Sequence, residues 1–360
     1  IGFQDVNEVW WLESIGGRHW MAKRVPDDEY VVAPNQQAID SFDFVDAYGE
    51  KRDHLCAPDL KDFVVRNHLD RSMEGASVAE NSCFDARGAF GSRSDSDHSY
   101  NTPRAWFMLR YLSPNAYDWQ GNMADYTPES DNLPWSLSPD RKITVEDVKY
   151  VLSSYYQGTP FNPYAQHGDP NERGRYRPIG INRTGHMVAM QIRPYAPEAS
   201  RSIMWISYGS GPFTAATPFY ANVDDTPAYL RDTTPEVSTG NLYWANRLIA
   251  ALADAHFYET SNAIEGFAES ARAYGHRLVE RTDAELREMS AQTSASESQE
   301  RAGAAEITEN ASIATIARLQ QSNEEMAEYL RTHVTKLLND VLYTSSNLMH
   351  NSFAMSDRWN

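Results

Sequence analysis

Hydrophobic residues near the start of the chain follow the pattern of short β-strands. Aromatic and β-branched residues are concentrated in 8–14, 18–25 and 29–33, and clusters of Gly, Pro and Asp separate these three segments. Turn-forming clusters at this spacing join antiparallel strands in hairpins. The pattern therefore predicts an antiparallel meander of three short strands.

The central part of the chain alternates between helical and loop patterns. Apolar residues at helical spacing predict helices over 57–69, over 102–112 and from Thr144 onwards. Asp147 stands three positions after Thr144, which is a variant of the capping box at a helix start. The intervening segments are polar, acidic or rich in proline and are predicted to be linkers, loops or surface excursions: 40–48, 71–91, 113–141 and 157–177.

Strand composition returns at 186–193 and 202–208, and helical periodicity then begins at Leu242. Two groups of antiparallel strands with helices between them favour an α+β fold over a parallel βαβ fold. The tract 290–305 has almost no apolar residues, so it is either a solvated helix or a flexible loop. The apolar stripes of the last helices suit a layer packed on the sheets, an oligomer interface, or both.

Composition narrows the class of protein. Hydrophobic residues make up 41% of the 360 residues and charged residues 23%, which is typical of a globular chain. The formal net charge of −18 disfavours nucleic acid and anionic membrane surfaces as partners. No apolar run approaches the ~20 residues of a membrane-spanning helix. Because the chain does not start with Met, its first residues do not reveal its compartment.

Asn35 follows the third predicted strand. Pro34 cannot donate to a sheet ladder, so the chain leaves the strand there and presents the amide of Asn35. One interpretation is a turn residue that bonds to its own backbone. The other is an oxyanion-hole donor, because a fixed amide N–H stabilises the negative charge that acyl transfer develops on a carbonyl oxygen.

Arg104 falls in the first turn of the predicted helix 102–112. An arginine in this position is usually a solvated surface charge. The helix dipole disfavours a cation at an N-terminus, so the position also hints at an anion nearby.

The segment Ser94 to His98 alternates Ser and Asp before a histidine. Alternating carboxylates resemble a calcium loop, but the glycine and the distal glutamate of an EF-hand are missing. A Ser-His-Asp triad is not supported either, because the sequence contains no Gly-x-Ser-x-Gly elbow. We therefore predict a tight loop held by side-chain to backbone bonds, and nothing in the sequence calls for a metal.

Cys56 and Cys83 are the two thiols of the chain. Two cysteines do not make a disulfide framework in a chain of this length, although one bridge between them stays open. No signature surrounds either residue, so both are interpreted as structural or incidental. Neither lies at an amino terminus, where its own α-amine would act as the base.

A set of motifs spread over the whole chain is shared with one family. Together with the meander ending in Ala33-Pro34-Asn35-Gln36, these motifs resemble the cysteine-dependent dipeptidases of the N-terminal nucleophile (Ntn) hydrolases, of the dipeptidase A and secernin type. The chain departs from that family at Ile1, because the amino-terminal cysteine nucleophile is not present. The motifs are Gly91 to His98, Tyr100 to Arg104, Lys142 to Val148, Tyr155 to Pro160, Arg177 to Arg183 and Tyr243 to Arg247.

The resemblance implies a fold and a division of the chain. The fold is a four-layer αββα Ntn-hydrolase sandwich with a helical extension. Residues 1–241 would form the major part of the catalytic domain, and residues 242–360 a mainly helical C-terminal region packed on it.

The resemblance also implies a reaction, the hydrolysis of dipeptides. A cysteine thiolate attacks the carbonyl, its α-amine moves the proton, and an acyl-enzyme forms and is hydrolysed. In the relatives an asparagine closing an equivalent strand donates to the oxyanion, and an arginine beginning a comparable helix lies beside the thiolate. Asn35 and Arg104 are therefore the expected catalytic residues, and no cofactor is needed.

The expected partners are a segment or chain carrying the nucleophilic cysteine, a short peptide substrate, and further copies of the chain in a homo-oligomer. Residues 1–360 alone are expected to be inactive. A cytoplasmic location is expected, with secretion left open. Two other functions also stay open, which are an acylase-type amide hydrolase of the same fold and a non-catalytic assembly protein that kept the fold.

Overall fold

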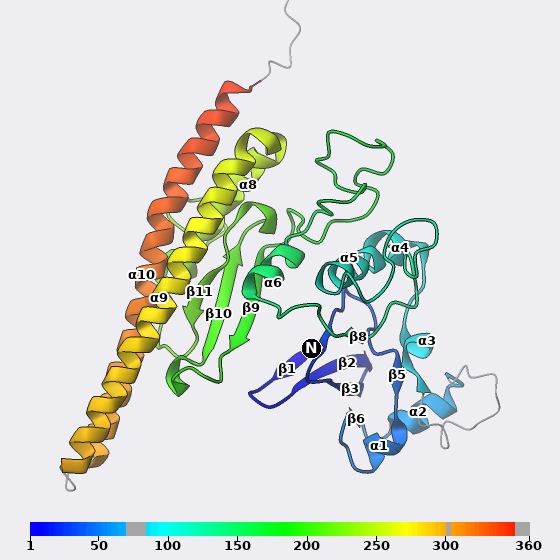
Figure 1. Cartoon of the computed structure of the whole chain (residues 1–360), viewed down its shortest axis with the longest axis horizontal. Coiled ribbons are helices and arrows are strands. Elements are labelled where there is room, and N and C mark those ends of the chain that lie inside the picture. The colour runs from blue at the N-terminus through cyan, green and yellow to red at the C-terminus, as the bar shows by residue number, and fades with distance from the viewer. Residues whose placement is uncertain (70–83, 300–303, 350–360) are drawn as a thin grey trace, which may run out of the picture. The chain divides into compact units, whose positions relative to one another are not determined.

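The described structure combines helices with antiparallel sheets. The computed structural model describes residues 1–69, 84–299 and 304–349 (Figure 1). Every strand pair in it is antiparallel. The predicted α+β class is therefore confirmed.

The chain forms two compact units. Unit 1 comprises residues 1–147 and 156–179, and unit 2 comprises residues 148–155 and 180–360. The predicted domain boundary at residue 241 falls inside unit 2. The division into a catalytic domain and a helical region stays a prediction.

The main sheet of unit 1 is a four-stranded antiparallel sheet near the start of the chain. The first two predicted strands are confirmed as β2 and β3, and they pair in register from Val9 with Val25 to Ser14 with Trp20. The sheet order is β1-β2-β3-β6. Its strands are β1 (Gly2–Gln4), β2 (Val9–Gly16), β3 (His19–Val25) and β6 (His54–Cys56).

The third predicted strand does not extend this meander. It is reduced to β4 (Tyr30–Val31), which pairs with β8 (Ser136–Leu137). The reason is that β6 occupies the edge of β3 that a third meander strand would need. A further two-stranded ladder joins β5 (Ser41–Phe42) to β7 (Phe84–Asp85).

The sequence predicted the longer helices of unit 1 well and missed the short ones. The predicted helix 102–112 is confirmed as α5 (Thr102–Leu112), and the helix predicted over 57–69 is confirmed as the shorter α2 (Leu60–Arg66). The predicted linker 40–48 instead contains β5 and α1 (Phe44–Tyr48), and the described part of 71–91 contains β7 and α3 (Ala86–Phe90).

Side-chain caps explain these two unexpected helices. The carboxylate of Asp43 accepts hydrogen bonds from the first-turn N–H groups of α1, and the carboxylate of Asp85 accepts one from Gly88 N in α3. Each helix has only five residues, which is too short for an apolar period to show in the sequence.

Two hydrophobic clusters fill unit 1. One lies between the main sheet and helices α1, α2 and α3, with Met21, Phe42 and Leu60 fully buried. The other is largely aromatic and surrounds α5, where Trp106, Leu109 and Leu112 are buried as the helical spacing predicted. The second cluster holds one face of α5 in place, which fixes the helix that carries Arg104.

Unit 2 packs long helices on a three-stranded sheet. The predicted strands 186–193 and 202–208 are confirmed as β9 (His186–Ile192) and β10 (Ser202–Tyr208). The third strand, β11 (Thr217–Tyr220), contains Pro218, and such a residue argues against a strand in the sequence. Its place at the edge of the sheet, in the order β11-β10-β9, explains why proline is tolerated there.

The helices of unit 2 begin with α6 (Val145–Leu152), which passes from unit 1 into unit 2. Thr144 and Asp147 form the predicted capping box, with Thr144 N donating to the Asp147 carboxylate at 2.9 Å and Asp147 N donating to Thr144 Oγ1 at 3.2 Å. The remaining helices are α7 (Ala228–Arg231), α8 (Leu242–Ala255), α9 (Phe257–Gln299) and α10 (Ala304–Asn347).

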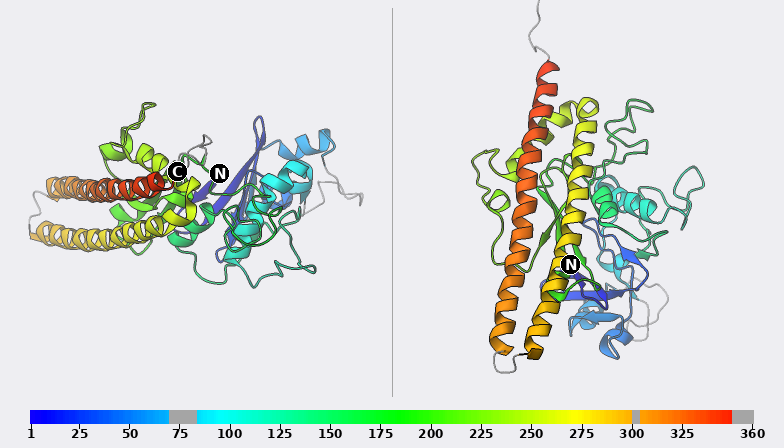
Figure 2. Two further views of the ribbon diagram at one scale, coloured as in Figure 1. Left: turned by 90° about the horizontal axis from the view of Figure 1, so that it is seen from above. Right: turned by 60° about the vertical axis from the view of Figure 1, so that its left-hand side comes forward.

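Helices α9 and α10 run side by side in opposite directions, and both contact β11 (Figure 2). The tract 290–305 is helical as far as Gln299 and again from Ala304, which resolves the choice between helix and loop for its described part. The predicted apolar stripe from Leu319 to Val341 is buried. Gly275 allows close approach, since a Cβ there would lie 2.5 Å from Pro218 Cδ.

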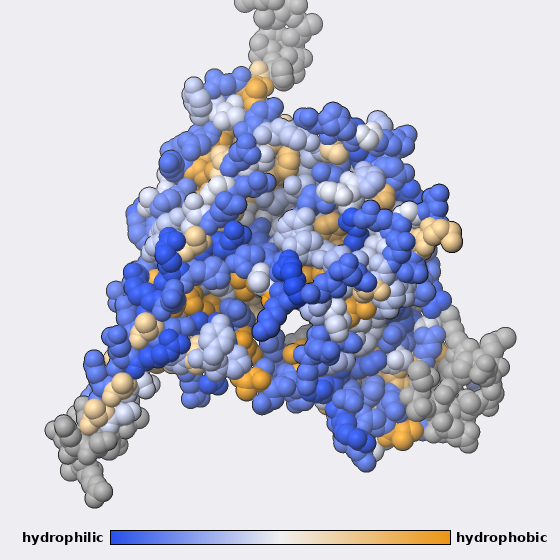
Figure 3. Space-filling model, viewed as in Figure 1, coloured by the Kyte–Doolittle hydropathy of each residue, from blue (hydrophilic) through white to orange (hydrophobic). Residues whose placement is uncertain are grey.

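The described helices do not include one that is long and apolar enough to cross a membrane. Hydrophilic residues cover most of the face of the molecule seen in Figure 3. This surface is consistent with the acidic composition of the chain.

A buried ion pair joins the sheet of unit 2 to α9. The guanidinium of Arg193, just after β9, donates to both carboxylate oxygens of Asp283 at 2.6 and 3.1 Å. Ser200 Oγ donates to the same carboxylate at 2.8 Å, and Arg193 also donates to Ser200 O. Arg193 and Asp283 are 4% and 5% exposed, so loss of either charge would leave the other buried and uncompensated.

We predict that Asp283→Ala lowers the free energy of unfolding by about 3–5 kcal/mol, because the guanidinium of Arg193 would stay buried without its partner. Urea unfolding followed by circular dichroism measures the change. Glu328→Ala is the matched control on α10, since its ion pair with Arg331 is exposed and should contribute little. Equal destabilisation by the two variants would contradict the role assigned to the buried pair.

Candidate active site

Asn35 lies in a short irregular segment that follows β4. Its φ angle is +58°, in the left-handed region that asparagine adopts more readily than most residues. Pro34 before it is buried, whereas Asn35 itself is exposed. The backbone therefore turns at Asn35 and leaves its side chain accessible.

Arg104 is buried in the first turn of α5 and contacts Asn35 directly. It is 8% exposed, so the interpretation as a solvated surface charge is wrong. Its guanidinium Nη2 donates to Asn35 Oδ1 and to Pro34 O, both at 3.0 Å. The structure thus brings together the two residues singled out in the sequence, which are 69 positions apart.

The contact determines how the amide of Asn35 is oriented. A guanidinium can only donate hydrogen bonds, so the amide oxygen must face Arg104 and the Nδ2 group must face away. Among the residues that the structure describes, Nδ2 has no hydrogen-bond partner. Arg104 therefore holds the Asn35 amide by its oxygen, and the two N–H donors of Nδ2 are available to an acceptor.

A chain of polar contacts supports Arg104 from α4 (Asp95–Tyr100). Arg104 donates from Nη2 to Asn101 Oδ1 at 2.5 Å and from Nε to Tyr100 O at 2.7 Å. Asn101 Nδ2 in turn donates to Asp97 Oδ1 at 2.6 Å. Each contact fixes the next residue, so the position of the Asn35 amide depends on the carboxylate of Asp97 through Asn101 and Arg104.

The segment 94–98 is the N-cap and first residues of helix α4, so the prediction of a tight loop is wrong. The predicted side-chain to backbone bonds are present, but they form a capping box in which Ser94 and Asp97 bond reciprocally. Burial alone would raise the pKa of Asp97, but hydrogen bonds from Ser92, Asn101 and Ser94 outweigh it and lower the pKa to about 2.

Arg177 is a site residue that the position-by-position sequence argument missed. Its guanidinium stacks over the ring of Tyr100 at 4.0 Å, and that of Arg104 lies 5.2 Å from the same ring. Burial, and then the positive charge of Arg177, lower the pKa of Arg104. No carboxylate pairs with Arg104 or Arg177 in the described part of the chain, so this region favours an anion.

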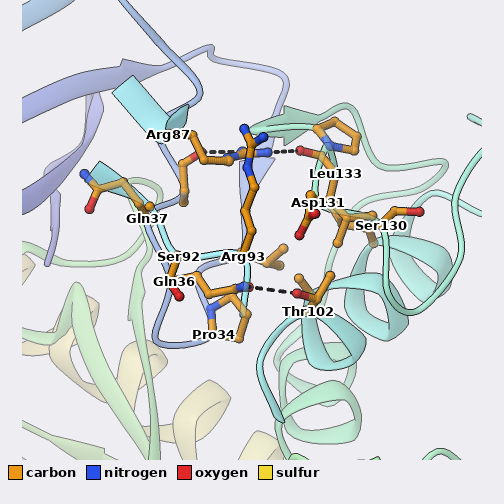
Figure 4. A pocket seen from close by; sticks show the side chains of 16 residues that line it. Pro34, Gln36, Gln37, Arg87, Ser92, Arg93, Thr102, Ser130, Asp131 and Leu133 are labelled. Carbon is orange, nitrogen blue, oxygen red and sulfur yellow. Dashed lines mark hydrogen bonds between the residues drawn. The ribbon is translucent and has the colours of Figure 1, made fainter. Parts of the chain in front are cut away.

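A small cavity adjoins the Asn35 segment (Figure 4). Pro34 and Gln36 line it from one side and Thr102 from α5, and Gln36 Nε2 donates to Thr102 Oγ1 at 3.0 Å. Its volume is about 40 Å³. The remaining wall comes mainly from 87–93 and 130–134.

His98 forms an ion pair instead of a triad or a metal site. Its Nε2 lies 2.9 Å from Asp131 Oδ1, and the hydrogen bond with Asp131 raises the pKa of His98. Within the described ranges, no three His, Cys, Asp or Glu side chains are grouped so that they could hold a metal ion.

The described thiol is poorly suited to nucleophilic attack. Cys56 lies in β6, half-buried, and burial raises its pKa. A reactive thiolate needs the opposite shift. Cys83 lies outside the described residues.

Comparison with known proteins identifies relatives over nearly the whole chain. The model of peptidase family C69 matches residues 1–270. A dipeptidase of Bifidobacterium longum is 50% identical over 99% of this chain and 69% of its own length. A probable dipeptidase A of Streptococcus pyogenes is 42% identical over 99% of this chain and 66% of its own length. The chain thus spans about two thirds of the length of these relatives.

We predict that the stability of the protein falls as the pH drops from about 4 to 2 through protonation of Asp97. Because the folded pKa lies below the unfolded value, the contribution is fully present above pH 4 and is worth about 2 kcal/mol. Urea unfolding at a series of pH values should show a shallower loss for Asp97→Asn. Asp95→Asn, an exposed position of the same helix, should keep the wild-type slope, and an unchanged slope for Asp97→Asn would contradict the assignment.

Proposed function

Because the chain belongs to peptidase family C69, we propose that the protein is a cysteine-type dipeptidase in which these residues supply the oxyanion site. The observation that carries the proposal is the contact between Asn35 and Arg104. It presents an amide with free N–H donors beside a cluster of positive charge, and this is the environment that a developing oxyanion needs.

The proposed reaction begins with attack on the scissile carbonyl carbon. The nucleophile is the thiolate of an amino-terminal cysteine that is not one of the residues 1–360. As the C–S bond forms, the electron pair of the C=O bond moves onto oxygen, and Asn35 Nδ2 donates to this oxyanion. The tetrahedral intermediate then collapses and the C–N bond breaks. The α-amine of the cysteine, which has taken the proton of the thiol, delivers it to the leaving amine, and water then hydrolyses the thioester and frees the thiol.

Arg104 is proposed to act in two ways. It holds the Asn35 amide so that the donors do not have to reorient during the reaction, which makes the stabilisation larger in the transition state than in the ground state. Its positive charge, together with that of Arg177, also lowers the pKa of a nearby thiol.

The four-layer αββα Ntn-hydrolase sandwich and a homo-oligomeric state belong to the same proposal. The antiparallel sheets of the two units, each covered by helices on at least one face, are the kind of element that such a sandwich is built from. The dipeptidase names of the relatives support dipeptides over acylated amino acids as substrates.

We predict that Asn35→Ala lowers kcat for a dipeptide by about 10²–10³-fold with KM nearly unchanged, because the lost donor acts on the oxyanion. Steady-state kinetics on the whole purified protein measure both constants. Asn171→Ala changes an exposed asparagine of the same unit whose side chain donates to Asp169, and should leave kcat within about twofold of wild type. A comparable loss of kcat in both variants would exclude Asn35 from the oxyanion site.

We also predict that Cys56→Ala and Cys83→Ala keep dipeptidase activity, because neither thiol can use its own α-amine as a base. A thiol-directed alkylating reagent should still inactivate the double variant, and mass spectrometry should place the label on an amino-terminal cysteine. Loss of activity in either single variant, with the protein still folded by circular dichroism, would overturn the proposed nucleophile. A panel of dipeptides and acylated amino acids separates a dipeptidase from an acylase.

A further inference from the structure

Arg93 is a charged residue of the cavity wall that the proposed reaction does not use. It follows α3 and lines the cavity next to Ser92 and Asp131, with its side chain extended along the wall (Figure 4). Its guanidinium makes no hydrogen bond or ion pair with any residue that the structure describes, and it is exposed to solvent. A ligand arriving from solvent can therefore reach it.

The second guanidinium of the cavity, Arg87, is occupied by the protein itself. It donates to Leu133 O at 2.5 Å and to Ala38 O at 2.6 Å, which ties together the two segments that form the wall. Its Nε is buried and has no partner among the described residues. Arg87 therefore shapes the cavity and adds a fixed positive charge to it.

The lining of the cavity has two guanidiniums, Arg87 and Arg93, and one carboxylate, Asp131. Burial, despite three nearby carboxylates, lowers the pKa of Arg87, and the positive charge of Arg93 acts in the same direction, so the two guanidiniums are close enough to repel. The one carboxylate of the lining, Asp131, is already paired with His98. An anion bound at Arg93 would pair with a guanidinium that has no ion-pair partner among the described residues.

We infer that Arg93 binds the free α-carboxylate of a dipeptide substrate, and that it thereby restricts the enzyme to peptides that end one residue after the scissile bond. This inference rests on the proposed function. The carboxylate carbon of a dipeptide is three bonds from the scissile carbonyl carbon, or within about 4 Å of it. The cavity wall includes Pro34 and Gln36, the two neighbours of Asn35, so the cavity lies next to the segment that would hold the oxyanion.

The cavity has room for a carboxylate. A buried water needs about 10–15 Å³, so the cavity of about 40 Å³ holds roughly three waters. A carboxylate has three heavy atoms and would replace them.

The test compares alanyl-alanine with its C-terminal amide, which lacks the negative charge, on the whole purified protein. Arg93→Gln should lower kcat/KM for the dipeptide by about 10–100-fold, mainly through KM, and leave kcat/KM for the amide within about twofold. Arg93→Lys should recover part of the loss, because it restores the charge without the forked donors. Arg52→Gln is the control, since Arg52 is an exposed arginine of the same unit, paired with Glu50.

Calorimetric binding of both compounds to the Asn35→Ala variant, with and without Arg93→Gln, separates this inference from the proposed function. The inference is supported if the variant binds the dipeptide more tightly than the amide and Arg93→Gln removes this preference, even if the wild-type protein hydrolyses neither compound. Hydrolysis by the wild-type protein with no Arg93-dependent preference overturns the inference and leaves the dipeptidase proposal standing. Equal losses for dipeptide and amide in Arg93→Gln would assign Arg93 a merely structural role and overturn the inference as well.

Discussion

The arrangement of the candidate site depends on one buried cation, the guanidinium of Arg104. Four oxygen acceptors surround it, but they are two backbone carbonyls and two side-chain amides, and none of them is a carboxylate. Burial of a charge is costly without such bonds, so the acceptors must be held in place for α5 to begin where it does. The same requirement draws the Asn35 segment onto the helix and aligns the amide.

The sequence was most informative where a helix was long enough to show an apolar period or began with a recognisable capping box. The helix 102–112 was predicted with its observed bounds, and the capping box of Thr144 and Asp147 was found in the pattern alone. Asn35 and Arg104 were chosen through the resemblance to the family, since the residues themselves offered only a position after a proline and a cation in a first turn. Their mutual contact could not be predicted, since nothing local relates two positions 69 residues apart.

The three segments wrongly predicted as linker or loop share a physical cause. Helices α1, α3 and α4 have five or six residues and are held by aspartate and serine caps, so side-chain hydrogen bonds substitute for the apolar stripe that a longer helix shows. Strand β11 is fully buried, yet its proline argues against a strand until its edge position is known. The sequence did not single out Arg93 or Arg177, because their proposed roles depend on the lack of a carboxylate partner among the residues described, which only the structure shows.

The left-handed backbone of Asn35 has a consequence for how this site could change over evolutionary time. Few residues tolerate such a φ angle, and glycine and aspartate are the nearest substitutes for asparagine. Glycine has no side-chain donor, and an ionised aspartate would place like charge beside an oxyanion. Glycine and aspartate, the two replacements closest to asparagine at such a φ angle, would thus keep the backbone and lose the donor.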